Sequence, residues 1–425
     1  MNVVTHRNGY KLVNLGKTTL DLEIPRSWNT VKIKDAIKKR SNKIELEPKK
    51  KYSRIKVKRR HVGVVLRDNI QGDKILTKNQ FKVCSGDYIL THKQVIHGSG
   101  GIIPKELDGA VVSGEYSQFY GSDLLDINYF DLFSHTEIFH KMIILTTQGV
   151  HIEKFVFLEK EWLNFKLPLP SLLEQQKITS ILSNVDNLIE STVQVITHSK
   201  KVKTGLMQKL LTRGIDHTKF KKVPWLFGKE IEIPDEWEVK TISELGKIVT
   251  GSTPDTTNKK YFGNDFLWAS PIDFEGEKYI TQTNSMLSEK GLSISRKIPK
   301  DAVLVVCIGS TIGKIGMASV EMSTNQQINS IICNNVDSNF IYYQLQQNNY
   351  LIKNRSNQSA VPIINKTEFG KFKLILPNEI QKQQKIATIL SNIDSKITSQ
   401  EQYKEKLQKL KKSLMQKLLT GEVRV

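Results

Sequence analysis

The sequence is poor in cysteine and has no long apolar run. Its 425 residues include three cysteines, which are widely spaced and show no CxxC or Cys/His pattern. Isolated cysteines of this kind are typical of reduced core residues, and they argue against a disulfide framework or a zinc site. No apolar stretch approaches the length that crosses a bilayer, and the first residues lack the apolar segment of a secretion signal. We therefore expect a cytoplasmic protein.

Catalytic signatures are also missing. The sequence contains no HExxH or GxSxG motif, no glycine-rich S-adenosylmethionine motif followed by an Asn/Asp-Pro-Pro-aromatic run, and no nuclease pattern of spaced carboxylates and lysine. Its nine histidines are scattered, and His92 and His97 have no carboxylate at ligand spacing, which favours surface histidines over a metal site. We expect a protein that binds its target without chemistry, cofactor or metal of its own.

The turn at residues 309–314, Gly-Ser-Thr-Ile-Gly-Lys, is the nearest approach to a nucleotide-binding motif. A P-loop has four residues between its glycines and Ser or Thr after the lysine, whereas this turn has three and is followed by Ile315. The turn is therefore not assigned to nucleotide binding. It either presents Ser310, Thr311 and Lys314 to DNA or is a plain structural turn.

Acidic residues are fewer than basic ones. Lys and Arg number 63 against 43 Asp and Glu, a net charge of +20 that favours a polyanionic partner such as nucleic acid over a basic but unspecialised protein. Residues 31–60 alone hold 14 Lys or Arg against three acidic residues. The alternation of residues 54–58 predicts a strand with its basic side chains on one face. Such a face suits binding to phosphates, and the alternative is a basic strand that only faces solvent. The predicted DNA contacts here are Lys49, Lys51, Arg54, Lys56, Lys58, Arg59 and Arg60.

The most informative feature present is a helical sequence that occurs twice. Residues 174–212 and 382–420 align without a gap at an offset of 208, and 21 of the 39 positions are identical. A Leu-Pro pair precedes each copy, and proline disfavours helix at the residue before it. An Ile-Pro-x-x-Trp motif also occurs twice, at residues 24–28 and 233–237. The chain is therefore a tandem duplication.

The duplication predicts the order globular segment, helix, globular segment, helix. We place a first globular domain at 1–170, a first helix at 171–213, a second globular domain at 214–376 and a second helix at 377–425. The globular segments read as α+β. Strands are expected at 62–66, 87–90, 142–145, 302–308 and 328–332, and helices at 124–133 and 339–349.

The two helices have coiled-coil character. In the first copy Ile178, Leu182, Val185 and Ile189 follow a 4,3,4 spacing, and the second copy begins in the same way. A helix of this amphipathicity must pack its apolar face against another surface. We expect that surface to be the other helix copy, paired antiparallel. The alternative is that each helix packs on its own domain. At 1.5 Å per residue, each copy spans roughly 58 Å.

Taken together, these motifs resemble the specificity subunit of type I restriction–modification systems over nearly the whole chain. The resemblance rests on the paired helices, with Gln-Gln-Lys-Ile near their starts and Leu-Met-Gln-Lys-Leu-Leu-Thr at their ends. In the second half it also rests on Gly-Ser-Thr-Pro at 251–254, Trp268, the 309–314 turn and Thr-Asn-Gln-Gln at 324–327. The first half lacks that turn and resembles a different recognition-domain subtype.

The resemblance implies two target-recognition domains, each reading half of an asymmetric, interrupted site on double-stranded DNA. It implies an antiparallel helix pair that acts as spacer and docks two methyltransferase subunits, together with two restriction/translocase subunits. S-adenosylmethionine, ATP and Mg²⁺ would belong to those partners. The competing reading is a DNA-independent coiled-coil scaffold or regulatory protein. A stand-alone nuclease or methyltransferase is a third.

The resemblance also marks candidate site residues in the second half and in the helices. Asn and Gln can contact adenine edges with both amide atoms, and Lys can contact guanine. The candidates for DNA contact are Ser310, Thr311, Lys314, Asn325, Gln326 and Gln327. The candidates for the spacer and partner-binding helices are Gln176, Ile178, Ile181, Leu182, Leu206, Leu210, Gln384, Ile386, Ile389, Leu390, Leu414 and Leu418.

Overall fold

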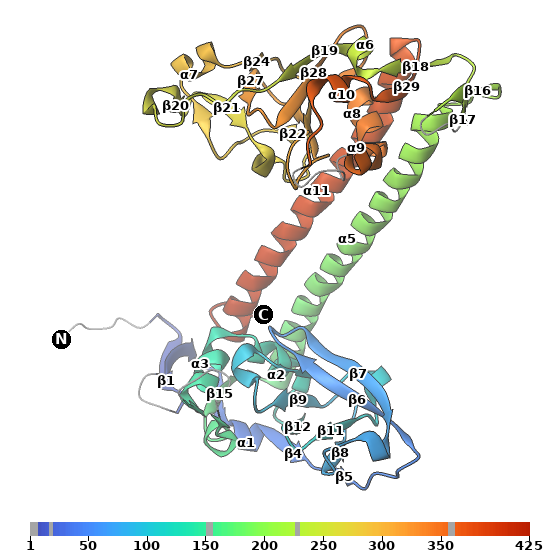
Figure 1. The fold of residues 1–425 in the computed structure, drawn as a ribbon. Helices are drawn as coiled ribbons and strands as arrows, with labels where there is room; N and C mark the ends of the chain where they lie inside the picture. The colour runs from blue at the N-terminus through green and yellow to red at the C-terminus, as the bar shows by residue number, and fades with distance from the viewer. Residues whose placement is uncertain (1–6, 17–19, 150–155, 226–229, 356–361) are drawn as a thin grey trace. The chain divides into compact units, whose positions relative to one another are not determined.

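A computed structural model describes residues 7–16, 20–149, 156–225, 230–355 and 362–425 (Figure 1). The chain forms two compact units. Unit 1 comprises residues 1–193 and 403–425, and unit 2 comprises residues 194–402. Each unit therefore contains one globular segment, the beginning of one long helix and the end of the other. No helix in the described ranges combines the length and apolar character needed to span a bilayer.

The two long helices are α5 (Leu172–Arg213) and α11 (Ile380–Leu419). Both match the predicted repeat closely, because the Leu-Pro pair that precedes each one cannot continue a helix in the N-terminal direction. Each is followed by a glycine in the left-handed region, Gly214 with φ 67° and Gly421 with φ 76°. Glycine adopts this conformation without a Cβ penalty, so it ends the helices cleanly.

Unit 1 contains a four-stranded sheet in the order β10-β9-β12-β4 and a five-stranded sheet in the order β5-β8-β11-β6-β7. Three two-stranded sheets, β1-β2, β15-β3 and β13-β14, complete its strands in the described residues. The bounds are β1 Tyr10–Asn14, β2 Asp21–Pro25, β3 Asn29–Lys32, β4 Ile37–Arg40, β5 Lys43–Ile44, β6 Lys51–Lys58, β7 Gly63–Gln71, β8 Gln80–Lys82, β9 Tyr88–Thr91, β10 Gly100–Ile102, β11 Val111–Ser113, β12 Tyr116–Gly121, β13 Thr147–Gln148, β14 Val156–Phe157 and β15 Lys166–Leu169. Its helices besides α5 and α11 are α1 Ile33–Ala36, α2 Ile127–Ser134, α3 Glu137–Leu145 and α4 Glu159–Trp162.

The main core of unit 1 is aromatic. Trp162 is fully buried and meets the rings of Phe119 and Phe139 edge-on at centroid distances of 5.8 and 5.9 Å. Edge-on pairs of this kind add to the burial of their area. The beginning of α5, through Ile178, and the end of α11, through Leu418, close the same core. The two helix segments therefore run antiparallel within unit 1.

Unit 2 contains two five-stranded sheets, β19-β28-β25-β26-β22 and β20-β23-β21-β27-β24, and two two-stranded sheets, β16-β17 and β18-β29. The strand bounds are β16 Phe220–Pro224, β17 Glu230–Pro234, β18 Trp237–Thr241, β19 Gly246–Thr250, β20 Phe262–Gly263, β21 Phe266–Ala269, β22 Tyr279–Ile280, β23 Met286–Leu287, β24 Lys297–Ile298, β25 Val303–Val306, β26 Ile315–Ala318, β27 Met322–Thr324, β28 Ile328–Cys333 and β29 Lys373–Pro377. Its helices besides α5 and α11 are α6 Ile242–Leu245, α7 Glu289–Ile294, α8 Ser338–Gln347, α9 Asn349–Arg355 and α10 Lys366–Gly370.

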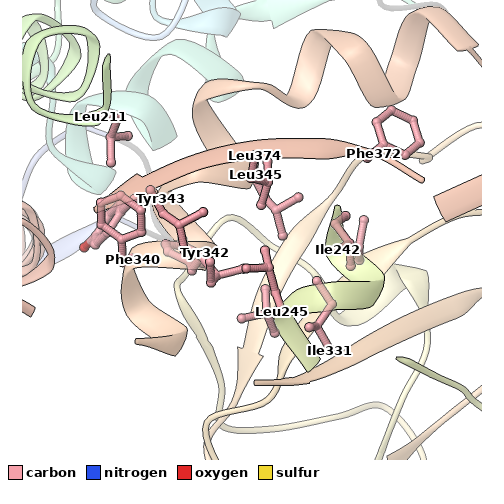
Figure 2. Packing of buried hydrophobic residues seen from close by; sticks show 14 of the residues in the cluster. Leu211, Ile242, Leu245, Ile331, Phe340, Tyr342, Tyr343, Leu345, Phe372 and Leu374 are labelled. Atoms are coloured by element: carbon pink, nitrogen blue, oxygen red, sulfur yellow. The ribbon is translucent and has the colours of Figure 1, made fainter. Parts of the chain in front are cut away.

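The main core of unit 2 gathers α8, α6, β28 and β29 around the end of α5. Figure 2 shows Phe340, Tyr343 and Leu345 of α8 among these buried side chains, with Leu211 of α5 beside them. The beginning of α11 adds Ile386 to the same cluster. Unit 2 thus repeats the plan of unit 1 with the roles of the two helices exchanged.

Most predicted elements agree with the structure, and one is wrong. Residues 142–145 were expected as a strand but end α3 (Glu137–Leu145). The four residues Met-Ile-Ile-Leu have strand-like composition, yet Phe139, Met142 and Ile143 are the buried residues of α3 and follow helical spacing. Thr136 caps the helix by accepting a hydrogen bond from the Phe139 amide at 3.2 Å.

Candidate nucleic-acid interface

The predicted basic strand of unit 1 is β6, and its alternation is confirmed. Ile55 and Val57 are buried, whereas Lys56 and Lys58 are exposed. The strand pairs antiparallel with β7, with a register shift between Arg54 and Ile55. Lys49 and Lys51 are exposed at the strand's beginning. The lysines therefore line a solvent-facing surface, as a phosphate-binding face requires.

Arg54 differs from these lysines because it has a carboxylate partner on the neighbouring strand. Its Nε and Nη2 atoms donate to the two carboxylate oxygens of Asp68 at 2.8 and 2.7 Å. The guanidinium hydrogen bond holds the pKa of Asp68 below its usual value. This bidentate pair satisfies Arg54 inside the hairpin, so its role in the hairpin is structural as well as electrostatic.

The tip of the β6–β7 hairpin carries Arg59 and Arg60 and is held on a neighbouring turn. Arg60 and His61 both lie in the left-handed region, with φ of 57° and 52°. Their amides donate to the carbonyl oxygens of His97 and Gly98 at 2.8 and 2.9 Å. Non-glycine residues rarely adopt this conformation, so the surrounding contacts must over-determine it.

The half-buried His61 holds that tip against the C-terminal end of α2 in unit 1. Its ring packs on His135 with a centroid distance of 4.2 Å. Burial lowers the pKa of His61 and lowers the pKa of His135 to about 3, with the neighbouring His61 and Lys411 adding to the second shift. Burial raises the pKa of Asp131, close to His135, to about 6. Sequence spacing gave no signal for this cluster.

His92 is not the uncommitted surface histidine that was expected. It is half-buried, and its Nε2 lies 2.8 Å from Ser117 Oγ and 3.0 Å from Glu159 Oε2. Glu159 also accepts hydrogen bonds from Lys39, at 2.6 Å, and from Ser117. Burial raises the pKa of Glu159, but these hydrogen bonds outweigh it and hold the pKa at about 2. Over the described ranges, no group of three or more His, Cys, Asp or Glu residues could hold a metal ion.

In unit 2 the 251–254 loop lies directly against the 324–327 turn. Ser252 N donates to the Thr324 carbonyl at 2.8 Å, and Gly251 N donates to the Ile328 carbonyl at 3.0 Å. A Cβ atom at Gly251 would lie 2.1 Å from the Asn325 carbonyl oxygen. Only glycine allows this approach. The first residue of the Gly-Ser-Thr-Pro motif is therefore a packing requirement.

The three predicted amides of the 325–327 turn have different surroundings. Asn325 is buried, and its Nδ2 donates to Gln327 Oε1 at 2.9 Å. Gln327 Nε2 donates to the Ile308 carbonyl at 3.4 Å and so connects this turn to the 309–314 turn. Gln326 is exposed, and its Oε1 accepts a hydrogen bond from Thr253 Oγ1. Gln326 is therefore the amide of the three best placed to meet a ligand.

The 309–314 turn is a tight turn rather than a free-standing loop. Its two glycines have φ of 94° and 85°. Ser310 is exposed, Thr311 is half-buried, and Lys314 Nζ donates to the Pro271 carbonyl at 3.2 Å. With residues of α8, α9 and α5 the turn lines a groove of about 590 Å³. Lys314 and Lys353 both line this groove, and their charges can attract an anion to it.

Ten of the twelve predicted helix residues pack on the cores of the units. In unit 1 they are Ile178, Ile181, Leu182, Leu414 and Leu418, and in unit 2 they are Leu206, Leu210, Ile386, Ile389 and Leu390. Gln176 and Gln384 are exposed. Packing within the chain therefore accounts for much of the identity between the helix copies.

Two glutamines of the Gln-Gln-Lys-Ile motif that were not predicted as site residues make the same joint in each unit. Gln175 accepts from the Asp126 amide at 2.8 Å and donates to the Pro170 carbonyl at 3.0 Å. Gln383 accepts from the Asp337 amide at 2.9 Å and donates to the Pro377 carbonyl at 2.8 Å. Both glutamines are fully buried. Their identity in the two copies of the repeat was the available signal.

Equivalent interhelical ion pairs occur in the two units. In unit 1 Asp186 Oδ1 lies 2.6 Å from Lys411 Nζ, and in unit 2 Asp394 Oδ1 lies 2.6 Å from Lys203 Nζ. The pairs correspond at the 208-residue offset, with the helices exchanged. Each aspartate and each lysine is identical between the copies, so both units keep both charges of the pair.

The duplicated architecture agrees with comparisons to known proteins. The family model described as "Type I restriction modification DNA specificity domain" matches residues 25–198 and 234–409, which together make up most of the chain. The chain belongs to this family. Its two family domains coincide with the two globular segments and the helix that follows each of them.

Relatives of this specificity-domain protein include two curated specificity subunits. The type I restriction enzyme MjaVIII specificity subunit of Methanocaldococcus jannaschii is 28% identical over 95% of both chains. The HindI specificity subunit of Haemophilus influenzae is 34% identical over 45% of this chain, and the aligned region spans 42% of that relative. The S subunit of a type I restriction–modification system from M. genitalium has the same fold at 14% identity, with 92% of this chain and 96% of that chain covered and a TM-score of 0.56.

The two halves of the specificity-domain protein differ where the Ile-Pro-x-x-Trp motif meets the long helices. In unit 1 Glu174 accepts from Trp28 Nε1 at 3.3 Å and pairs with Arg424 at 2.5 Å. The equivalent position in unit 2 is Lys382, which pairs with Glu236. Trp237 Nε1 then has no acceptor within the described part of the chain. The equivalent position of this joint is therefore acidic in unit 1, where it is Glu174, and basic in unit 2, where it is Lys382.

Proposed function

We propose that this chain is the DNA sequence-specificity subunit of a type I restriction–modification complex. Each globular domain would read one half of an asymmetric, interrupted duplex site, and the chain itself would perform no chemistry. One observation carries the proposal: the two units share their helix joints but present different surfaces. Unit 1 displays exposed lysines on β6, whereas unit 2 displays Gln326 on a turn packed against Gly251. Two domains that pack on the helices in the same way but expose different side chains are suited to recognising two different half-sites.

The unit 1 surface suits phosphate binding, and the unit 2 surface suits base readout. Lysines on a strand neutralise phosphates and set affinity without selecting sequence. A Gln carboxamide can donate and accept at a purine edge in the major groove. Under this proposal, Lys49, Lys51, Lys56, Lys58, Arg59 and Arg60 position the first half-site. Ser310, Thr311, Lys314 and Gln326 act on the second, with Asn325 and Gln327 as their scaffold.

The partners in this proposal are two methyltransferase subunits and two restriction/translocase subunits. The methyltransferases would bind S-adenosylmethionine, and the restriction subunits would use ATP and Mg²⁺. Exposed apolar residues at the beginning of α5 support a docking role for the helices: the adjacent Leu172 and Leu173 are 41% and 65% exposed. The helix pair would also set the distance between the half-sites.

A domain exchange tests the proposal. Residues 230–375 are replaced by the corresponding segment of another specificity subunit, and the chain is expressed with its methyltransferase partner. Mapping of methylated adenines in cellular DNA should show one altered half-site and one unchanged half-site. If neither half or both halves change, the two-reader proposal is wrong.

Salt dependence separates DNA recognition from a DNA-independent scaffold. A protein that neutralises several phosphates loses affinity steeply as salt rises, because counterions are released on binding. The complex should therefore bind duplex DNA with a strongly negative slope of log affinity against log salt. Affinity that is independent of salt would support the scaffold instead.

A further inference from the structure

The 251–254 loop is built to hold one hydroxyl group beside Gln326. Besides the two backbone hydrogen bonds to the 324–328 segment, Ser252 is fixed through both its carbonyl and its side chain. Trp268 Nε1 donates to the Ser252 carbonyl at 3.1 Å, and Arg296 N donates to Ser252 Oγ at 3.1 Å. Arg296 Nη1 also donates to the Thr250 carbonyl at 2.8 Å. Thr253 is thus an exposed residue on a loop whose preceding residues are firmly held.

The Thr253 side chain is directed at Gln326. Its hydroxyl donates to Gln326 Oε1, and both side chains are exposed. An exposed hydrogen bond between neutral groups contributes only modestly to stability, because it replaces hydrogen bonds to water. Its physical consequence is orientation: with Oε1 turned toward Thr253, the Nε2 amide group and the second Oε1 lone pair define one preferred direction of approach.

We propose that Thr253 is a positioning residue that orients the Gln326 carboxamide to read a purine edge in the second half-site. This inference rests on the proposed function. A glutamine reads a purine by donating from Nε2 to N7 and, for adenine, by accepting from the N6 amino group at Oε1. Both interactions need a fixed carboxamide plane, since a freely rotating amide also pays the entropy of ordering on binding. The Thr253 hydroxyl favours that plane before DNA arrives.

The test uses four variants of the full chain in complex with its methyltransferase partner. Gln326→Ala removes the reader, Thr253→Val removes the hydroxyl but keeps the β-branched shape, and Thr253→Ser restores the hydroxyl. Thr257→Val is the nearby control, because the Thr257 hydroxyl donates to Asp255 Oδ1 at 2.7 Å and is not directed at Gln326. Adenine methylation maps give the half-site preference of each complex.

We expect Gln326→Ala and Thr253→Val to relax the same single base pair of the same half-site. A good bidentate base contact supplies about ten- to hundredfold discrimination, so preference at that position should fall by up to this factor. Thr253→Ser should retain the wild-type preference, and Thr257→Val should leave it unchanged. Overall affinity for non-specific duplex should stay the same in all four, because no phosphate-binding group is removed.

A second measurement uses 7-deazapurine duplexes, which lack the N7 acceptor. Substitution at one purine should weaken binding of the wild-type complex and have no further effect on the Gln326→Ala and Thr253→Val complexes. Wild-type preference in Thr253→Val, with relaxed preference in Gln326→Ala, overturns the positioning role and leaves the proposed function intact. If the wild-type complex shows no bipartite site, the proposed function itself fails.

Discussion

The two interhelical aspartates provide a matched pair for testing how much each unit depends on its helix joint. Asp394 has two partners: Lys203 Nζ at 2.6 Å and the hydroxyl of buried Tyr343 at 2.7 Å. Asp186, its equivalent in unit 1, forms an ion pair with Lys411. The Asp394 side chain is 23% exposed and the Asp186 side chain is 46% exposed. The same substitution should therefore cost more in unit 2.

The expected losses of free energy follow from the ion-pair and hydrogen-bond partners that each substitution leaves behind. An exposed ion pair contributes about 0.2–1 kcal/mol, so Asp186→Ala should lower the free energy of opening in unit 1 by roughly that amount. A hydrogen bond to a charged group contributes about 1.5–3 kcal/mol, and Asp394→Ala removes one from the Tyr343 hydroxyl as well as the ion pair. Burial and the Asp394 carboxylate both raise the pKa of Tyr343, so its phenol stays protonated and loses its charged acceptor, with Ser391 Oγ at 3.2 Å as its remaining neutral hydrogen-bond neighbour. We expect a loss of about 2–4 kcal/mol in unit 2.

Native-state hydrogen exchange resolves the two effects because it reports each helix segment separately. Asp394→Ala should reduce protection in residues 194–213 and 380–402, and Asp186→Ala should reduce it less in 172–193 and 403–419. Asp394→Asn, which keeps an acceptor for Tyr343, should fall between Asp394→Ala and wild type. Equal losses of protection for the two alanine variants would refute the reasoning that the second partner decides the difference.

Three further outcomes are expected. Replacing Lys56 and Lys58 by Gln should weaken binding to all DNA sequences and reduce the salt slope by about 0.9 for each phosphate that is no longer neutralised, measured by titration at several salt concentrations; an unchanged slope would remove them from the interface. Gln383→Ala should lower the free energy of unfolding by about 1–3 kcal/mol in urea, because it leaves the Asp337 amide without its acceptor; wild-type stability would show that water replaces it. Burial lowers the pKa of His135 to about 3 in the folded protein, so as the pH falls below 6.5 His135 becomes protonated in the unfolded chain before it does in the folded chain. By pH 5 this difference lowers the free energy of unfolding of unit 1 by roughly 2 kcal/mol. Asp131, whose pKa burial raises to about 6, takes up a proton in the folded state and opposes part of that loss. His135→Gln should therefore flatten the acid limb of the stability profile, and an unaltered limb would contradict the assignment.

Periodic features were predictable because they depend on local spacing. The helix repeat, its Leu-Pro beginnings and the alternation of Lys56 and Lys58 with buried neighbours all follow from one residue's relation to the next few. The strand predicted at 142–145 failed for the same reason: four apolar residues fit either period, and the cap at Thr136 lies outside them. A segment of four residues is too short to distinguish the helical period from the strand period.

Contacts between distant residues decided the candidate sites. Arg54 resembled its neighbouring lysines in sequence, but Asp68 on the paired strand neutralises it. His92 had no carboxylate nearby in sequence, but Glu159 reaches it across 67 residues. Among three adjacent amides, burial and turn geometry assigned two to scaffolding and left Gln326 to solvent. None of these outcomes has a spacing signature, because each depends on which strands and turns become neighbours.

The sequence by itself determined that this protein is a duplicated, basic chain with two long helices and no catalytic motif. Those properties are sums or repeats along the chain, and folding does not alter them. Only the tertiary structure decided that each unit is closed by the beginning of one helix and the end of the other. It also decided that most of the predicted helix residues pack inward and that, of the three predicted amides at 325–327, Gln326 is the exposed one and accepts a hydrogen bond from Thr253. The reason is physical: burial and hydrogen bonding depend on distance in space, which the order of residues does not specify.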